Sequence, residues 1–226
     1  FLFPQNKLYS TTLTKNIDDF GLIALMYHRF EENKYPSTNI RINDFKEHLR
    51  MIKDQNIEFI NPKKFKEEII YHKDKRKILL TIDDAFLSFY KNAWPILKKE
   101  RIPFILFVST REAGAFNYMS WKQIKELYDE DFVEIGNHSH SHEYLVDEDY
   151  SIIKDDIIQS IKIFRDKLGK NSNFFSYPFG EYSKEFKKII MKLGFDFAFG
   201  QHSGVIDETK DLFELPRFPI NEKYGE

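Results

Sequence analysis

Three closely spaced histidines are the strongest sign of chemistry in this sequence. His138, His140 and His142 follow an apolar stretch, residues 132–135, that is expected to form a buried strand. On an extended chain all three side chains point the same way, and on a helix His138 and His142 lie one turn apart, so this pair could bind a metal in either geometry. His140 fits only the extended case. A surface turn with chance histidines is the alternative interpretation, and the strand just before them disfavours it.

Two adjacent carboxylates, Asp83 and Asp84, end a second apolar stretch, residues 78–82. Two carboxylates held close together resist joint ionisation unless a cation lies nearby. A helix cap or a turn would also explain the pair taken alone. Beside two histidines, one carboxylate completes a two-histidine, one-aspartate metal set with a position open for water, and the other is free to act as a base. A metal site would therefore account for both the histidine cluster and the pair of carboxylates.

Weaker candidates follow other expected strands. In residues 177–180, Tyr-Pro-Phe-Gly, a rigid proline and a permissive glycine could hold the backbone N–H of Phe179 toward a developing oxyanion, although a plain turn is the simpler interpretation. His202 lies in a loop. The sequence is equally consistent with a general acid there and with a histidine that is only solvated or packed. His28 ends the first strand, and we expect it to serve structural packing.

Strands and helices alternate along the chain, with short connections between them. The expected strands are residues 22–28, 57–60, 78–82, 104–108, 132–135, 174–177 and 195–199, with an extended piece at 215–220. The expected helices start at a cap on Asn43, at Asn61-Pro62, near Pro95, at Ser120, at residue 151 before a stop at Gly169, and at Ser183 before a stop at Gly194. An open parallel sheet binds ligands at the one point where its strand order reverses, whereas a barrel brings the carboxyl ends of all its strands to one mouth. Since the candidates follow several different strands, the sequence predicts an α/β fold with a TIM-like barrel, complete or incomplete.

Composition excludes several classes of function. The 226 residues suit one domain with a full core, and 34 Lys and Arg against 36 Asp and Glu give a net charge of −2. We therefore expect no nucleic-acid partner and no polybasic membrane patch. The chain has no cysteine, and its longest apolar run, residues 21–27, is far too short to span a bilayer.

Three motifs together resemble those of the polysaccharide deacetylases called carbohydrate esterase family 4, the NodB-homology domains. Residues 81–85, Thr-Ile-Asp-Asp-Ala, look like the family's TFDDG motif; residues 138–142 fit H(S/T)xxH, and residues 176–180 are similar to RxPxG. The three occur in the family's order, and the resemblance covers residues 22–220. It implies a single-domain, distorted (β/α)7 barrel, in agreement with the six or seven strand–helix units counted above.

The resemblance also implies roles for the candidate residues. Asp84, His138 and His142 would bind a divalent metal ion, with Zn²⁺ favoured and Co²⁺ or Ni²⁺ as alternatives. Asp83 would be the catalytic base, and His140 would occupy a free position of its motif. The ion would polarise an acetyl carbonyl and lower the pKa of a bound water.

The chain departs from the family pattern at several positions. Ala85 replaces the glycine of the first motif, and Ser176 stands where an arginine usually orients the base. We expect Arg217 to orient Asp83 instead. The family's DxxDW and LxH motifs have no clear counterpart, and we expect His202 to protonate the leaving amine.

The expected function is that of a metal-dependent hydrolase that removes N-acetyl groups from N-acetylglucosamine units of a polysaccharide. The opening Tyr-His-Arg-Phe at residues 27–30, the missing motif arginine and residues 215–220 look most like the branch that deacetylates poly-β-1,6-N-acetylglucosamine of biofilms. A peptidoglycan- or chitin-type deacetylase, an O-acetyl esterase and a non-catalytic glycan-binding barrel are the alternatives. The spare carboxylate, Asp83, disfavours the last. The oligomeric state is left open.

The resemblance and the start of the chain also suggest where the protein acts. Residues 21–226 are expected to form the deacetylase domain, and residues 1–20, which are polar and unpatterned, an N-terminal arm or the remnant of a leader. The sequence begins without Met and without a basic and apolar leader, so we expect either that a targeting segment has been removed or that the sequence is trimmed. With the expected polymer in the cell envelope, we predict export to the periplasm, the cell surface or the medium.

Overall fold

A parallel sheet forms the centre of the fold. The computed structural model describes residues 21–71 and 76–224, so the arm expected at residues 1–20 lies outside the described part. The strands follow one another in the order β10–β1–β5–β6–β7–β8–β9, and β4 pairs with β5 off this path. All these pairs are parallel. The strands are β1 (Gly21–Tyr27), β4 (Glu58–Phe59), β5 (Arg76–Ile82), β6 (Phe104–Val108), β7 (Val133–Asn137), β8 (Phe174–Ser176), β9 (Phe197–Phe199) and β10 (Phe218–Pro219).

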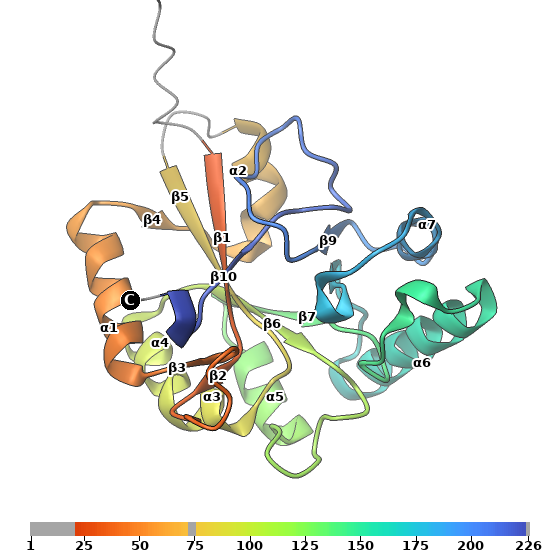
Figure 1. Cartoon of the computed structure of the whole chain (residues 1–226), viewed down its shortest axis with the longest axis horizontal. Helices are drawn as coiled ribbons and strands as arrows, with labels where there is room; N and C mark the ends of the chain where they lie inside the picture. Colours follow the sequence, from red (N-terminus) through yellow and green to blue (C-terminus); the bar gives the residue numbers. More distant parts are fainter. Residues whose placement is uncertain (1–20, 72–75, 225–226) are drawn as a thin grey trace, which may run out of the picture.

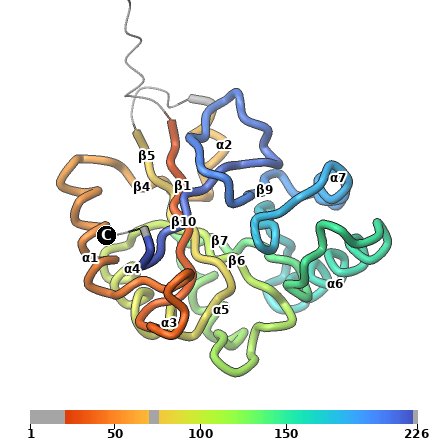
Figure 2. The backbone as a smooth tube through the Cα atoms, in the orientation of Figure 1, coloured from red at the N-terminus to blue at the C-terminus, as the bar shows by residue number. Residues whose placement is uncertain are grey.

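The sheet curls toward closure. Phe199 at the end of β9 bridges to Leu215, just before β10, which lies beside β1. Figure 2 shows this C-terminal segment running alongside β1. The predicted distorted barrel is therefore confirmed. The open side of the sheet, between β9 and β1, is spanned by the segment that leads from β9 into β10.

Helices lie around the outside of the strands (Figure 1). They are α1 (Ile42–Asp54), α2 (Phe65–Tyr71), α3 (Leu87–Asn92), α4 (Trp94–Glu100), α5 (Trp121–Tyr128), α6 (Tyr150–Leu168) and α7 (Lys184–Lys192). The Ser120 side chain caps α5 in a capping box, and Gly169, with a φ of 82°, ends α6 in the left-handed conformation expected of such a glycine. No helix among the described residues is both long and apolar enough to cross a bilayer.

Alternate residues of β5 face two different cores. Ile78, Leu80 and Ile82 pack with apolar side chains of α1, α4 and α5, whereas Leu79 belongs to a second cluster on the opposite face, rich in phenylalanine. Because side chains alternate along a strand, Asp83 continues the row that begins with Leu79. The apolar residues of β5 thus aim the first carboxylate into the barrel.

Several local expectations were wrong. Asn43 is not the cap of α1, whose cap position is Arg41 without a side-chain hydrogen bond. Instead the Ile42 N–H donates to the Glu31 carboxylate at 2.6 Å, an acceptor that local sequence pattern does not reveal. A separate helix, α3, precedes α4 and was not expected, and neither was a small parallel pair, β2 (Arg29–Phe30) with β3 (Asn39–Ile40).

Other expected elements are present with different bounds. The strands expected at residues 57–60, 195–199 and 215–220 are shorter, as β4, β9 and β10. The helix expected at Asn61-Pro62 begins as a 3₁₀ turn, Pro62–Lys64, before α2, with the Asn61 side chain accepting from the Lys63 N–H. Short strands and 3₁₀ turns depend on contacts with distant residues, so their ends are the least predictable bounds.

The packing of α1 on the end of β1 leads to a first prediction. Phe45 is fully buried, and its ring lies 5.2 Å from that of Tyr27 and 5.0 Å from that of Phe30. Phe45→Ala should lower the free energy of unfolding by about 3–5 kcal/mol, because it removes a large side chain from a closed core. Met51→Ala, on the same helix but 46% exposed, is the control and should change it by less than about 0.5 kcal/mol. Urea denaturation measures both, and equal effects would contradict this packing.

Candidate active site and metal centre

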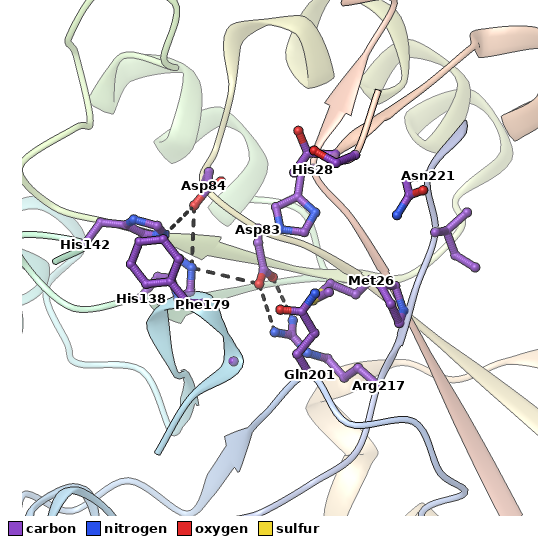
Figure 3. A pocket seen from close by; sticks show the side chains of 15 residues that line it. Met26, His28, Asp83, Asp84, His138, His142, Phe179, Gln201, Arg217 and Asn221 are labelled. Atoms are coloured by element: carbon purple, nitrogen blue, oxygen red, sulfur yellow. Dashed lines mark hydrogen bonds and ion pairs between the residues drawn. The ribbon is translucent and has the colours of Figure 1, made fainter. Parts of the chain in front are cut away.

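A cavity lies where the barrel strands end. It is lined by His28 after β1, Asp83 and Asp84 after β5, His138 after β7, and Arg217 just before β10. Figure 3 shows these side chains converging from different strands. The carboxyl ends of parallel strands meet at one mouth of a barrel, so residues far apart in sequence share one site.

Three of the lining residues form a candidate metal centre. Asp84, His138 and His142 each offer one ligand atom, and these atoms all lie within 4.8 Å of one another. Asp84 Oδ1 is 3.5 Å from His138 Nε2 and 3.1 Å from His142 Nε2. Two imidazoles and one carboxylate are a donor set typical of catalytic zinc sites, which keep a further position open. The residues present therefore fit a divalent ion.

The environment of His138 fixes which ring nitrogen faces Asp84. His138 Nδ1 lies 2.7 Å from the Ser176 carbonyl oxygen. A carbonyl only accepts hydrogen bonds, so Nδ1 donates to it and Nε2 is the ring nitrogen that faces Asp84. Histidine ligands of metals are commonly oriented by such a second contact. Ser176, which replaces the motif arginine, thus orients a candidate ligand through its backbone.

His140 lies away from the candidate ligands. Its Nδ1 is 2.8 Å from the Thr110 hydroxyl, and the group of possible metal-binding side chains contains His138 and His142 without it. The chain here is neither extended nor helical, because Ser139 and His142 have φ values of 68° and 53°. The extended arrangement with all three rings on one side is therefore absent.

Asp83 is held by an arginine from the other end of the chain. Arg217 Nη1 donates to Asp83 Oδ1 at 2.7 Å, and Nη2 donates to Oδ2 at 2.9 Å, with both residues buried. Ser176 Oγ donates to Oδ2 at 3.2 Å, and Arg217 Nε donates to the Gly200 carbonyl at 2.9 Å. Burial raises the pKa of Asp83, but the Arg217 guanidinium together with His138 and His28 outweighs it, so the pKa is held below its usual value.

The two adjacent carboxylates have different partners because the chain turns sharply between them. Asp84 and Ala85 have φ values of 70° and 54°, a conformation that glycine adopts readily and alanine does not. This turn explains why a glycine suits the position of Ala85 in the motif. Burial raises the pKa of Asp84, but the neighbouring histidines, His138 and His142 foremost, outweigh it, so the pKa lies well below its usual value.

His28 is a residue whose place the sequence interpretation missed. It lines the cavity instead of serving only as packing, and Figure 3 shows its ring beside Asp83. Burial holds the pKa of His28 below its usual value, because the opposing effect of the Asp84 and Asp83 carboxylates is smaller. The β1–β5 register aligns Tyr27 with Ile82, which brings the next residues, His28 and Asp83, together. That register is the signal that could have identified His28.

Of the two other residues with a role predicted from the sequence, Phe179 lies at the cavity and His202 does not. Phe179 lines the cavity with a φ of 59°, and its amide donates no hydrogen bond to any of the described residues. His202 is exposed and is not among the described residues that line the cavity; its neighbour Gln201 is. The His202 carbonyl accepts from the Arg217 N–H at 2.9 Å, so this residue supports Arg217 through its backbone.

Comparisons with known proteins identify the family of this chain. The family model described as polysaccharide deacetylase matches residues 71–198, more than half of the chain. A poly-β-1,6-N-acetyl-D-glucosamine N-deacetylase of Staphylococcus epidermidis is 26% identical over 223 residues, covering 91% of this chain and 74% of that protein.

Solved structures show the same fold. The structure of IcaB from Ammonifex degensii has a TM-score of 0.83 and 25% identity, over 90% of this chain and 93% of that one. A Streptococcus pyogenes deacetylase, PplD, solved in complex with acetate, has a TM-score of 0.81 and 22% identity, over 90% and 94% of the two chains. The family and the enzyme class expected from the three motifs are thereby confirmed. The chain belongs to the polysaccharide deacetylase family, whose members are metal-dependent hydrolases, and it has their distorted (β/α)7 barrel.

Proposed function

We propose that this enzyme removes N-acetyl groups from poly-β-1,6-N-acetylglucosamine, using a divalent ion held by Asp84, His138 and His142. The observation that carries the proposal is a complete two-histidine, one-aspartate set beside a second carboxylate, Asp83, that has a partner of its own. Simple glycan binding would need no such additional carboxylate. The ion would polarise the acetyl carbonyl and lower the pKa of the attacking water. Zn²⁺ is the favoured ion because it binds imidazole and carboxylate ligands, with Co²⁺ and Ni²⁺ as alternatives.

Asp83 acts as the general base. The pKa lowered by Arg217 keeps its carboxylate ionised, and each oxygen retains acceptor capacity beyond the bonds from Arg217. Asp83 Oδ2 lies 3.9 Å from His138 Nε2, which places the base next to the ligand set. Asp83 takes the proton of the water as the new carbon–oxygen bond forms. Arg217 orients the carboxylate in place of the motif arginine.

Phe179 and His28 complete the reaction. The Phe179 amide, which is free of other acceptors among the described residues, stabilises the negative charge on the acetyl oxygen. The carbon–nitrogen bond then breaks, and the leaving amine must gain a proton while acetate departs. We assign to His28, in place of His202, the transfer to the amine of the proton that Asp83 took from the water, because His28 lines the cavity beside Asp83 and His202 does not.

Aromatic side chains at the cavity suit a sugar substrate. Phe179 and Tyr144 are 52% and 48% exposed, and their rings lie edge to face, 5.8 Å apart. Exposed rings can stack on the apolar face of a pyranose. The β-1,6 linkage is proposed from the name of the S. epidermidis relative. Since such a polymer lies outside the cytoplasm, we expect the enzyme to act in the periplasm, on the cell surface or in the medium.

Metal binding should depend on His142 and not on His140. His142→Ala removes one of three candidate ligands and should lower Zn²⁺ affinity at least tenfold, whereas His140→Ala should leave it within about twofold because that ring contacts Thr110. Competition with a chromophoric chelator measures both affinities. Loss of Zn²⁺ binding on replacement of His140 alone would overturn the ligand assignment.

Removal of Arg217 should leave a buried charge without its partner. Arg217→Met is expected to destabilise the fold by about 3–5 kcal/mol, and the double variant with Asp83→Asn should be more stable than Arg217→Met alone. Arg50→Met is the control: this exposed arginine pairs with Glu47 and Asp54 and should cost less than about 1 kcal/mol. Guanidinium denaturation of wild type, Arg217→Met, Asp83→Asn, the double variant and Arg50→Met gives the five free energies. A double variant less stable than either single variant would contradict a charge-driven pair.

The proposed activity itself is tested by acetate release from β-1,6- and β-1,4-linked N-acetylglucosamine oligomers with added Zn²⁺ or Co²⁺. Wild type should prefer the β-1,6 series. Asp83→Asn should bind metal normally but lose at least a hundredfold in kcat, since general-base catalysis contributes about 10²–10⁴-fold. Full activity of this variant would refute the base assignment. Preference for β-1,4 oligomers would favour a chitin- or peptidoglycan-type substrate, and no release from any acetylated glycan would favour a binding domain.

A further inference from the structure

Helix α6 reaches the ligand-bearing segment through polar side chains. We call residues 138–142 the histidine loop. The two central amides of this loop, those of His140 and Ser141, donate to the two carboxylate oxygens of Asp156, at 2.7 Å to Oδ1 and 3.0 Å to Oδ2. Hydrogen bonds to a charged acceptor are shorter and stronger than those to a neutral one. Asp156 therefore binds the middle of the loop, between the two candidate ligands.

A second residue of α6 holds the start of the loop. Ser160, one helical turn after Asp156, accepts from Asn137 Nδ2 at 2.9 Å. Asn137 Oδ1 in turn accepts from the Ser139 N–H at 2.9 Å. Residues four apart lie on the same face of a helix, so a single face of α6 supports both the entry and the centre of the histidine loop.

The backbone of the loop needs such support. Ser139 and His142 both have left-handed φ values, 68° and 53°, which side chains with a Cβ adopt only where surrounding contacts hold them. The His142 N–H donates to Ser139 Oγ at 3.0 Å, which links the two strained positions. In this conformation the His142 ring lies beside Asp84, with Nε2 at 3.1 Å from Oδ1. The ligand position is thus coupled to the fixed course of the loop.

We propose that Asp156 is a positioning residue for the metal ligand His142: its carboxylate binds two successive loop amides and so holds the turn that presents the His142 ring to Asp84. The inference rests on the metal centre of the proposed function. Asp156 is not a ligand, since it does not belong to the group of described residues that could hold the ion. It acts on the centre only through the backbone of the loop.

Zn²⁺ affinity tests this role. Asp156→Asn keeps the shape of the side chain but presents an NH₂ group to one of the two amides, so one hydrogen bond is lost. We expect Zn²⁺, titrated against a chromophoric chelator, to bind Asp156→Asn about 10–100-fold more weakly than wild type, the range found for partners that orient metal ligands. Asp155→Asn is the matched control: it removes the same charge from the adjacent, exposed position of α6 and should bind Zn²⁺ like wild type.

Two further measurements separate positioning from general stability. Circular dichroism of the same samples should show an equal folded fraction for wild type and both variants. At saturating Co²⁺, the visible absorption bands of Asp156→Asn should move toward those of His142→Ala, while Asp155→Asn overlays wild type. Equal Zn²⁺ affinities for the two aspartate variants would overturn the proposal, and so would an affinity loss that follows loss of the folded fraction. If wild type itself bound no Zn²⁺ or Co²⁺, the metal centre would fail together with the inference.

Discussion

The buried ion pair between Asp83 and Arg217 is the interaction on which the rest of the site depends. A carboxylate removed from water is costly unless a charged partner and hydrogen bonds replace its hydration. Here the replacement comes from several strand ends at once: Arg217 precedes β10, Ser176 ends β8, and the Gly200 carbonyl that fixes the guanidinium follows β9. Satisfying one buried charge therefore brings together the strands that form the mouth of the barrel.

The same constraint explains how two neighbouring aspartates acquire different chemistry. Asp83 faces a permanent cation of the protein, whereas Asp84 faces two imidazoles across a left-handed turn. Each carboxylate has polar partners of its own, so the two do not have to share one proton. A base and a ligand can then stand one residue apart without competing for the same ion.

The repeating units and the strand-end positions of the candidate ligands could be predicted because their signals are local. The apolar run of β5 ends in its own carboxylates, and the Ser120 cap and the Gly169 stop are fixed by residues within a turn. What could not be predicted depends on distant contacts. The position of His28 follows from the pairing of β1 with β5, and the N-terminus of α1 is capped by Glu31 from another loop. The contact of Arg217 with Asp83 is also distant in sequence, but it was expected, because the motif at Ser176 lacks its arginine.

The origin of that guanidinium has a consequence for the order of folding. Arg217 lies beyond residues 71–198, the part that the family model matches, and directly precedes Phe218, which pairs with Leu25 of β1, so the pairing of β10 with β1 holds Arg217 in the site. A chain emerging from the ribosome has the ligand set long before it has the partner of Asp83. Docking of the final strand and completion of the charge balance are thus one event, and a nascent or C-terminally shortened chain could present the metal ligands without a properly held base.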